Sequence, residues 1–462
     1  MRASPPDSPA RICAGMTPRD VLRLLPLFVG TLVVPLDGMV NVAFPSVLAA
    51  FGLEVPQIQW LVICYVLTYG SLLLAVGRIG DVFGHARVFR FGLAWSAVAF
   101  VACALAPTYG ALLGARVLQG VGAALVLGCG PALATGMFPE AMRVRALAAY
   151  AAGLAAGGAL GPLLGGVLVQ ALGWQAVWWV RAPIALAALV LARRLAAPVR
   201  DGPREPFDLA GAVLLSATVA FAVLAVNRAP APVALMLAAA AIGSGIGFVW
   251  RSGRSAHPII DLGLFRRPGF AAVNLANTLV HLAGFAVMLL APFYLTRVWG
   301  LPPVLLGLVL GANALGAMAG ASLGGWLVPR QGARAVAAGG AVLSAAGLLA
   351  VGLGGPLAVL VVALGVQGLG IGLFTLAYTD VVTATMRRQD RGVAGSLTQL
   401  TRTLGVVSAA SLLTLLFGAT EAGRLALGAT ADEAFLAAFR RVFLVVAPLP
   451  LVALLFLPPR GR

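Results

Sequence analysis

The feature that most constrains this sequence is a succession of long apolar segments, each about as long as a membrane-spanning helix. Such a helix needs about 20 predominantly apolar residues. Of the 462 residues, 61% are hydrophobic and only 10% are charged. A soluble protein cannot bury so much apolar surface, so we expect an all-α polytopic membrane protein embedded in a lipid bilayer.

Fourteen segments are predicted to span the membrane. Their approximate bounds are 22–47, 57–77, 88–107, 109–136, 146–171, 174–193, 208–227, 231–250, 269–296, 302–328, 334–354, 356–384, 392–418 and 437–458. With the N-terminus placed in the cytoplasm, most arginines fall in cytoplasmic loops and tails, as they do in membrane proteins generally. The opposite face receives only Arg228, Arg297, Arg424, Arg440 and Arg441. This bias predicts that both termini are cytoplasmic.

The basic residues exclude several classes of function. The net charge is +17, but the arginines are spread between apolar runs, so no nucleic-acid partner is expected. The sequence contains no lysine, which excludes the P-loop of a Walker-type ATPase. Three histidines and four cysteines are scattered along the chain and form no metal-ligand cluster. We therefore expect no cofactor, and an ion gradient becomes the obvious source of energy.

Two loops indicate an internal repeat. GRIGDVFGHAR begins at Gly77, and GWLVPRQGAR begins at Gly325. Gly77 aligns with Gly325, Gly84 aligns with Gly332, and a basic residue closes each loop. Eight predicted helices separate the copies, so two extra helices lie between two six-helix halves. The predicted division is a tail at 1–20, a six-helix bundle at 21–200, a two-helix linker at 201–256 and a second bundle at 257–462.

Several motifs occur in an order and spacing typical of one transporter family. They are LDGMVNVAFP at 36–45, the run at 58–87, RVLQGVGAAL at 116–125, GLAAGGALGPLLGG at 153–166, FDLAGAVLLS at 207–216 and HPIIDLGLFRRPGFAAVNLA at 257–276. Over almost its whole length the chain resembles the major facilitator superfamily, and within it the fourteen-helix drug:proton antiporters. The resemblance implies the major facilitator fold in a 6+2+6 arrangement and alternating access across the cytoplasmic membrane of a bacterium.

Segment 146–171 carries a glycine every four residues, at Gly153, Gly157, Gly161 and Gly165, with Pro162 beside them. Bare backbone lets a neighbouring helix approach closely, and the proline introduces a hinge. Ordinary tight packing is the alternative explanation. The resemblance implies that this helix controls leak and the direction of exchange.

In the loop after segment 57–77, glycines permit a tight turn, and Asp81 can accept hydrogen bonds from a helix N-terminus. The resemblance suggests that the partner helix begins near 391–394, which would latch the cytoplasmic side shut. A solvated turn is the alternative. Val82, His85 and Ala86 replace the family's usual basic residues, so the charge network of the family is thinned here.

Asp37 is the only acidic residue deep in an apolar segment of the first half. A charge in hydrocarbon costs about 2.5–3.5 kcal/mol, so such a residue faces a cavity or a partner. Apolar surroundings favour the neutral acid, and nearby Arg116 would favour the carboxylate. We expect Asp37 and Arg116 to carry proton coupling. The alternative is a permanent ion pair that holds helices together.

The candidates for the substrate cavity are Asn41, Tyr65, Asn274, Asn277 and His281. The last three lie on one face of segment 269–296, where they either contact substrate or join helices. Two arginines also lie inside predicted spans. Arg402 matches a basic position in the family and is expected to be structural. Arg181 replaces a usual asparagine, and it either shapes the charge preference of the cavity or points to the outer interface.

The sequence therefore predicts a proton-coupled exporter of amphipathic or cationic small molecules such as drugs. The expected partners are the small-molecule substrate, the proton and the bilayer, and we expect a monomer with no enzymatic activity. A narrow exporter of one self-made metabolite or antibiotic is the main alternative. A membrane-embedded transferase is a remote one, because no loop supplies paired acidic or His/Asp clusters.

Overall fold

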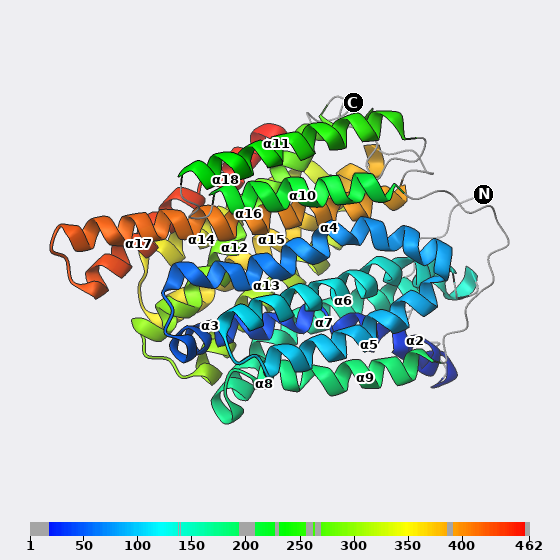
Figure 1. Cartoon of the computed structure of the whole chain (residues 1–462), viewed down its shortest axis with the longest axis horizontal. Helices are drawn as coiled ribbons and strands as arrows, with labels where there is room; N and C mark the ends of the chain where they lie inside the picture. Colours follow the sequence, from blue (N-terminus) through cyan, green and yellow to red (C-terminus); the bar gives the residue numbers. More distant parts are fainter. Residues whose placement is uncertain are drawn as a thin grey trace.

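The computed structural model describes residues 18–136, 138, 140–193, 208–226, 231–255, 262–263, 269–385 and 391–457. The described chain is helical throughout, and its long helices run roughly side by side along the longest axis of the molecule (Figure 1). Eleven of these helices are long and apolar enough to cross a membrane. The three other predicted spans coincide with α4 and with the shorter apolar segments 176–192 and 213–222.

The helices from the first part of the chain pack mostly against one another. They are α2 (Pro18–Leu32), α3 (Gly38–Phe51), α4 (Gln59–Phe83), α5 (His85–Ala104), α6 (Tyr109–Gly136), α7 (Glu140–Leu172), α8 (Ala176–Trp179) and α9 (Arg181–Ala192). Short 3-10 helices precede α3 and α4, at Pro35–Asp37 (η1) and Val55–Ile58 (η2).

The helices from the last part of the chain form a second mutually packed group. They are α12 (Phe270–Arg297), α13 (Pro303–Gln331), α14 (Ala333–Leu353), α15 (Leu357–Thr385), α16 (Arg391–Ala426), α17 (Ala431–Val446), α18 (Leu449–Ala453) and η5 (Leu454–Phe456). Between the two groups in sequence lie α10 (Leu209–Val226) and α11 (Ala231–Arg254), which pack on each other. Because α10 also contacts α4 and α16, this pair lies against both groups.

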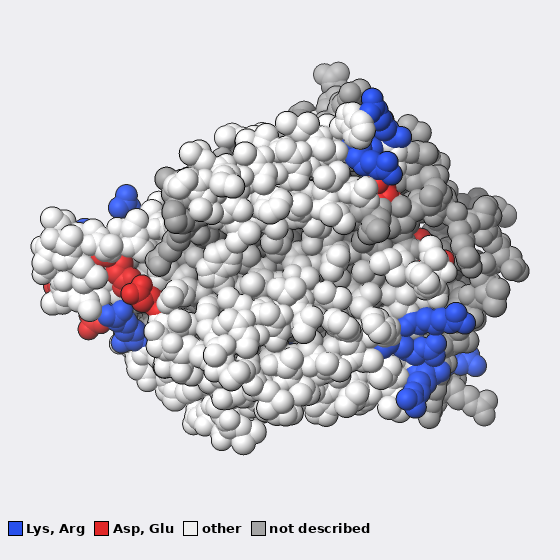
Figure 2. Space-filling model, in the orientation of Figure 1, with Lys and Arg blue, Asp and Glu red and all other residues white. Residues whose placement is uncertain are grey.

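Charged side chains gather at the two ends of the molecule and leave a broad uncharged belt between them (Figure 2). One end is rich in arginine (Figure 2). The start of α5 and the ends of α9 and α11 lie at this end (Figure 1), and they carry Arg87, Arg193 and Arg254. The opposite end mixes both signs, and there Arg297 pairs with Asp432 at 2.8 Å. Large apolar side chains are exposed along the belt, as expected for a surface that faces lipid tails.

The first predicted span is a broken helix. It consists of α2, a turn at Val33 and Val34, the 3-10 helix η1 and then α3. Pro35 explains the break, because proline has no N–H and its ring clashes with the carbonyl one turn earlier. Backbone carbonyls freed at such a break need other donors inside a membrane. Asp37 is the last residue of η1 and therefore lies at the break.

The two helix groups meet through contacts that lie toward the mixed-charge end of the molecule. The contacts join α7 to α13, α3 to α12 and α4 to α16. Hydrogen bonds cross this boundary from Asn41 Nδ2 to Met288 Sδ at 3.4 Å, from the Val304 amide to Gln170 Oε1 at 3.2 Å and from Thr414 Oγ1 to Gln59 Oε1 at 2.7 Å. Phe44 and Phe293 also stack across it.

Candidate functional site

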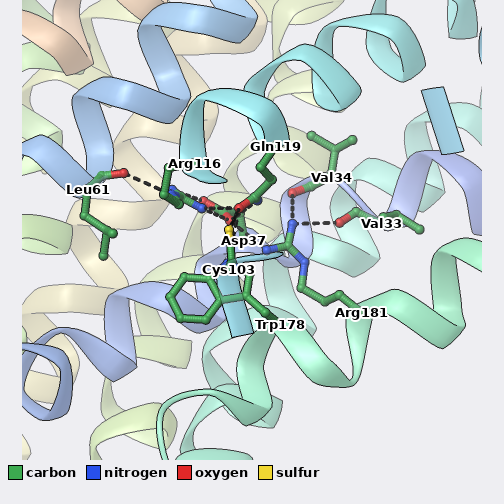
Figure 3. Close-up of polar contacts among 9 residues, drawn as sticks. All are labelled: Val33, Val34, Asp37, Leu61, Cys103, Arg116, Gln119, Trp178 and Arg181. Carbon is green, nitrogen blue, oxygen red and sulfur yellow. Dashed lines mark hydrogen bonds and ion pairs between the residues drawn. The ribbon is translucent and has the colours of Figure 1, made fainter. Parts of the chain in front are cut away.

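Asp37 lies at the centre of a polar cluster inside the first helix group (Figure 3). Arg116, from α6, holds it in a bidentate pair. Arg116 Nη1 donates to Asp37 Oδ1 at 2.7 Å, and Arg116 Nη2 donates to Oδ2 at 2.9 Å. The Arg116 Nε donates to the Leu61 carbonyl at 3.0 Å, and the guanidinium stacks on the Tyr65 ring at 4.3 Å. The structure thus brings Asp37, Arg116 and Tyr65 together.

Arg181 is a second arginine on the same carboxylate. From the first turn of α9, its Nη1 donates to Asp37 Oδ1 at 2.7 Å. Its Nη2 donates to the carbonyls of Val33 and Val34 at 3.2 and 3.5 Å, which are carbonyls at the break in the first span. The guanidinium stacks on the Phe100 ring at 4.2 Å. Of the two roles left open for Arg181, this position excludes the outer interface and places its charge beside Asp37.

Gln119 completes the cluster. Its Nε2 donates to Asp37 Oδ1 at 2.7 Å, while its Oε1 accepts from Arg116 Nη1 at 2.8 Å and from Trp178 Nε1 at 3.2 Å. Each of these four hydrogen bonds between side chains and Asp37 in the described chain is donated to the carboxylate. Such an environment stabilises the ionised form through charge-assisted hydrogen bonds.

The cluster carries an excess of positive charge. It contains two guanidinium groups and one carboxylate, which leaves a net charge of +1. The Arg116 and Arg181 side chains are only 2% and 1% exposed, whereas 17% of the Asp37 side chain is exposed. The carboxylate is therefore the accessible member, and the arginines lie behind it.

The glycines of α7 form the surface on which the broken first span lies. An added Cβ at Gly157 would lie 2.6 Å from the Leu32 carbonyl oxygen, and one at Gly161 would lie 3.2 Å from the Gly38 Cα. Gly153 faces Thr31 and Phe28, and Gly165 faces Met39 in the same way. Since contacts this short leave no room for a side chain, the glycine repeat permits the close approach that places Asp37.

Residues beside this ladder reach the second helix group. Gly166 and Gly307 face each other so closely that a Cβ at Gly307 would lie 3.0 Å from the Gly166 Cα. Pro162 contacts Gly38 of α3 and also Gly307. The helix α7 therefore touches the break in the first span on one side and α13 on the other.

The polar residues of α12 join three helices. Asn277 Nδ2 donates to Thr401 Oγ1 of α16 at 2.8 Å, and the Tyr378 hydroxyl of α15 donates to Asn274 Oδ1 at 2.9 Å. His281 Nδ1 lies 2.9 Å from the Asn277 carbonyl oxygen, and the side chain is almost fully buried. These contacts are those of residues that hold helices together. Asn41, by contrast, is half-buried and faces Met288 across the boundary between the groups.

The loop expected after segment 57–77 is mostly helical: Gly77 and Asp81 lie in the last turns of α4, and Gly84 alone separates α4 from α5. Asp81 lies 3.1 Å from His85 Nε2, one helical turn along, and its side chain is 40% exposed. Gly84 has φ +88, which favours glycine and forms the turn between the two helices. The predicted partner helix does begin at Arg391, but the side chains of 391–394 lie outside the described residues. The latch therefore stays a prediction.

Sequence reasoning missed two members of the cluster, Gln119 and Trp178. A signal for Gln119 was present, because it follows Arg116 by three residues and so lies on the same face of one helix. Nothing comparable pointed to Trp178. Its contact with Gln119 depends on how the short helix α8 leads into α9.

The chain has clear relatives. The family model described as Major Facilitator Superfamily matches residues 27–252 and 273–462. The cephamycin export protein CmcT of Amycolatopsis lactamdurans is 33% identical over 440 residues, which cover 90% of this chain and 89% of CmcT. The multidrug efflux pump LfrA of Mycolicibacterium smegmatis is 32% identical, with 87% of this chain and 81% of LfrA covered.

A solved structure shares the overall fold. It is the crystal structure of a bacterial homologue of the human lysosomal transporter Spinster, in an inward-facing and occupied conformation. The TM-score is 0.70 at 18% identity, with 96% of this chain and 97% of that chain covered.

Proposed function

This chain belongs to the major facilitator superfamily, and we propose that it exports amphipathic small molecules across the cytoplasmic membrane of a bacterium in exchange for protons. The observation that carries this proposal is the buried Asp37 cluster at the break in the first span. An ionisable group inside a membrane protein is costly and marks an ion or substrate pathway. The name of LfrA, a multidrug efflux pump, supports export of drug-like substrates.

We propose fourteen spans in a 6+2+6 arrangement, with both termini in the cytoplasm. The arginine-rich end would then lie in the cytoplasm, following the general bias of basic loops. The mixed-charge end, where the two helix groups touch, would face outward. This orientation makes the described structure a state that is closed toward the outside.

Asp37 and Arg116 are proposed to couple protons to transport. Arg116, Gln119 and Arg181 all belong to the first helix group, so rocking of the two groups alone does not separate them from Asp37. Proton uptake therefore requires a local change at the break, where η1 and α3 meet. The helix α7 contacts both this break and α13, so it can transmit movement between the groups to Asp37.

We propose that the proton gradient supplies the energy for export and that no cofactor is needed. We also propose that the protein works as a monomer. Moving one charge through 100 mV yields about 2.3 kcal/mol, which exceeds the cost of a tenfold concentration gradient.

A first experiment tests the energy source. Cells that express the protein and are loaded with a fluorescent drug should lose export when a protonophore is added. Export should persist when ATP is depleted while the proton gradient is maintained. Cells with the empty vector provide the control, and export that follows ATP at a constant gradient would contradict the proposal.

A second candidate function is narrow export of one self-made compound. The name of CmcT, a cephamycin export protein, supports this reading. A panel of chemically unrelated toxic compounds separates the two, because a multidrug exporter protects a pump-deficient host against several of them and a narrow exporter against one class.

A further inference from the structure

The excess positive charge of the Asp37 cluster bears on which substrates the proposed exporter accepts. We infer that the cavity favours substrates with an anionic group such as a carboxylate, and that Arg181 is the residue that sets this preference. The inference rests on the proposed function and makes the substrate class more specific.

The charges around Asp37 support this inference. Arg116 pairs with the carboxylate in bidentate geometry, so these two groups already neutralise each other. Arg181 adds a second positive charge to Oδ1, an oxygen that also accepts from Gln119. Among the described residues, Asp37 is the only acid that forms an ion pair with either arginine. Two guanidinium groups thus share one carboxylate, and one positive charge of the cluster stays unbalanced.

The other contacts of Arg181 do not cancel its charge. The Phe100 ring and the carbonyls of Val33 and Val34 are neutral. The Arg181 Nε is buried and has no hydrogen-bond partner among the described residues. A buried guanidinium that has an unused donor and shares its only carboxylate with a second arginine favours the approach of an anion.

The second helix group adds a further positive charge near its contact with α4. That charge is Arg402, whose side chain is exposed on α16. It lies between Thr401, which contacts Asn277, and Thr403, which faces Gly70 of α4. Arg402 is therefore at the level where the two groups of helices approach each other.

Access to the cluster leads past the carboxylate. At the exposed edge of Asp37, a cation approaches a carboxylate whose single negative charge is outweighed by the two positive charges of Arg116 and Arg181. The local field repels the cation, whereas an anion is attracted by the uncompensated charge. The two substrate classes should therefore differ in affinity even when their sizes and shapes match.

The experiment uses two xanthene dyes of similar size, anionic fluorescein and cationic rhodamine 123. Binding to the purified full-length protein in lipid nanodiscs is followed by fluorescence anisotropy. We expect wild type to bind fluorescein roughly tenfold more tightly than rhodamine 123. Arg181→Gln, which leaves the Asp37–Arg116 pair neutral, should lower this ratio by roughly tenfold, and Arg181→Lys should keep most of it.

Arg193→Gln is the matched control, because it removes the same charge from an exposed position at the end of the same helix. Its dye preference should equal that of wild type. A wild type that prefers rhodamine 123, or fails to bind fluorescein, would overturn the inference. The inference would also be overturned if Arg181→Gln kept the wild-type ratio of fluorescein to rhodamine 123 affinity. The same holds if Arg181→Lys behaved like Arg181→Gln, since either result assigns Arg181 a purely structural role.

If Arg181→Gln does not fold, the wild-type ratio and the lysine variant still decide the question. A separate assay follows uptake of fluorescein into inside-out vesicles with an imposed proton gradient. Anion-selective binding without gradient-driven uptake would contradict the proposed function while leaving the selectivity of the site intact.

Discussion

The carboxylate of Asp37 balances part of the charge of two buried arginines, so its removal should affect stability as well as the proposed proton coupling. In wild type the cluster carries a net charge of +1. Asp37→Asn would raise it to +2 in a buried region, with the Arg116 pair broken. Breaking a buried ion pair by removing one partner typically costs about 3–5 kcal/mol, because a charge stays buried without compensation.

We therefore expect Asp37→Asn to abolish gradient-driven export and also to lower the free energy of unfolding by about 3 kcal/mol or more. The double variant Asp37→Asn/Arg181→Gln restores the net charge to +1 and should recover part of the lost stability. Thermal unfolding in detergent, measured for wild type, both single variants and the double variant, checks this. Equal stability of wild type and Asp37→Asn would show that the carboxylate is not needed to balance the arginines.

The sequence predicted only part of this cluster. A lone acid in the first span and an arginine in RVLQGVGAAL suggested the Asp37–Arg116 partnership. The contact of Arg181 could not be predicted in the same way. It depends on where α9 begins and on the carbonyls exposed by the break at Pro35, and neither is visible in hydrophobic periodicity. Arg181 also departs from the family's usual asparagine, so the resemblance offered no role for it.

At the scale of elements, α7 and the broken first span fit together as one unit. The glycine repeat was recognised from the sequence as a surface for close approach. The segment that packs on this surface could not be identified from the sequence, because a bare helix face can pack on any neighbour. The structure shows that the partner is the segment that carries Asp37. Geometry at this contact therefore controls the position of the carboxylate.

We expect Gly157→Leu and Gly161→Leu to be expressed in the membrane but to be impaired in exchange. In either variant the new side chain would force the first span away from α7, at Leu32 and Pro35 or at Gly38. Gly158→Leu is the control, because a Cβ there meets no atom within 4 Å. Drug export by the three variants at matched expression checks this. Full activity of both ladder variants would show that the close approach is dispensable.

The polar stripe on α12 shows another limit of sequence reasoning. The spacing of Asn274, Asn277 and His281 correctly placed them on one helix face. Periodicity alone could not tell whether that face meets substrate or neighbouring helices. Asn274 and Asn277 bond to Tyr378 and Thr401, residues more than 100 positions away in the chain. Only the packing of α12 against α15 and α16 reveals these partners.

At the scale of the whole molecule, the contacts between the helix groups define a closed end. Gly166 lies against Gly307, and Gln170 accepts a hydrogen bond from the Val304 amide. The proposed alternating access would require this end to open during each cycle. The positions of the long helices could be predicted from the lengths of the apolar segments. The contacts at the closed end could not be predicted in this way, because they depend on how the two helix groups pack against each other.

A covalent link across the closed end should stop transport. We expect the variant Gln170→Cys/Val304→Cys, treated with a short bifunctional thiol reagent that contains a disulfide, to lose export. Activity should return after reduction. Each single cysteine variant treated in the same way is the control for the native cysteines. Full export by the linked protein would show that this end does not need to open.

The arginine-rich end described above also determines how the protein sits among lipids. Every basic side chain there is a guanidinium, which binds a phosphate in a two-point fork where an ammonium makes a single-point contact. Anionic headgroups should therefore collect around Arg87, Arg193 and Arg254 and hold this end at the leaflet surface. Vesicles made only of zwitterionic lipid would lack this anchorage. In them the carrier should insert with less uniform orientation, measurable as protease access to its loops from one side.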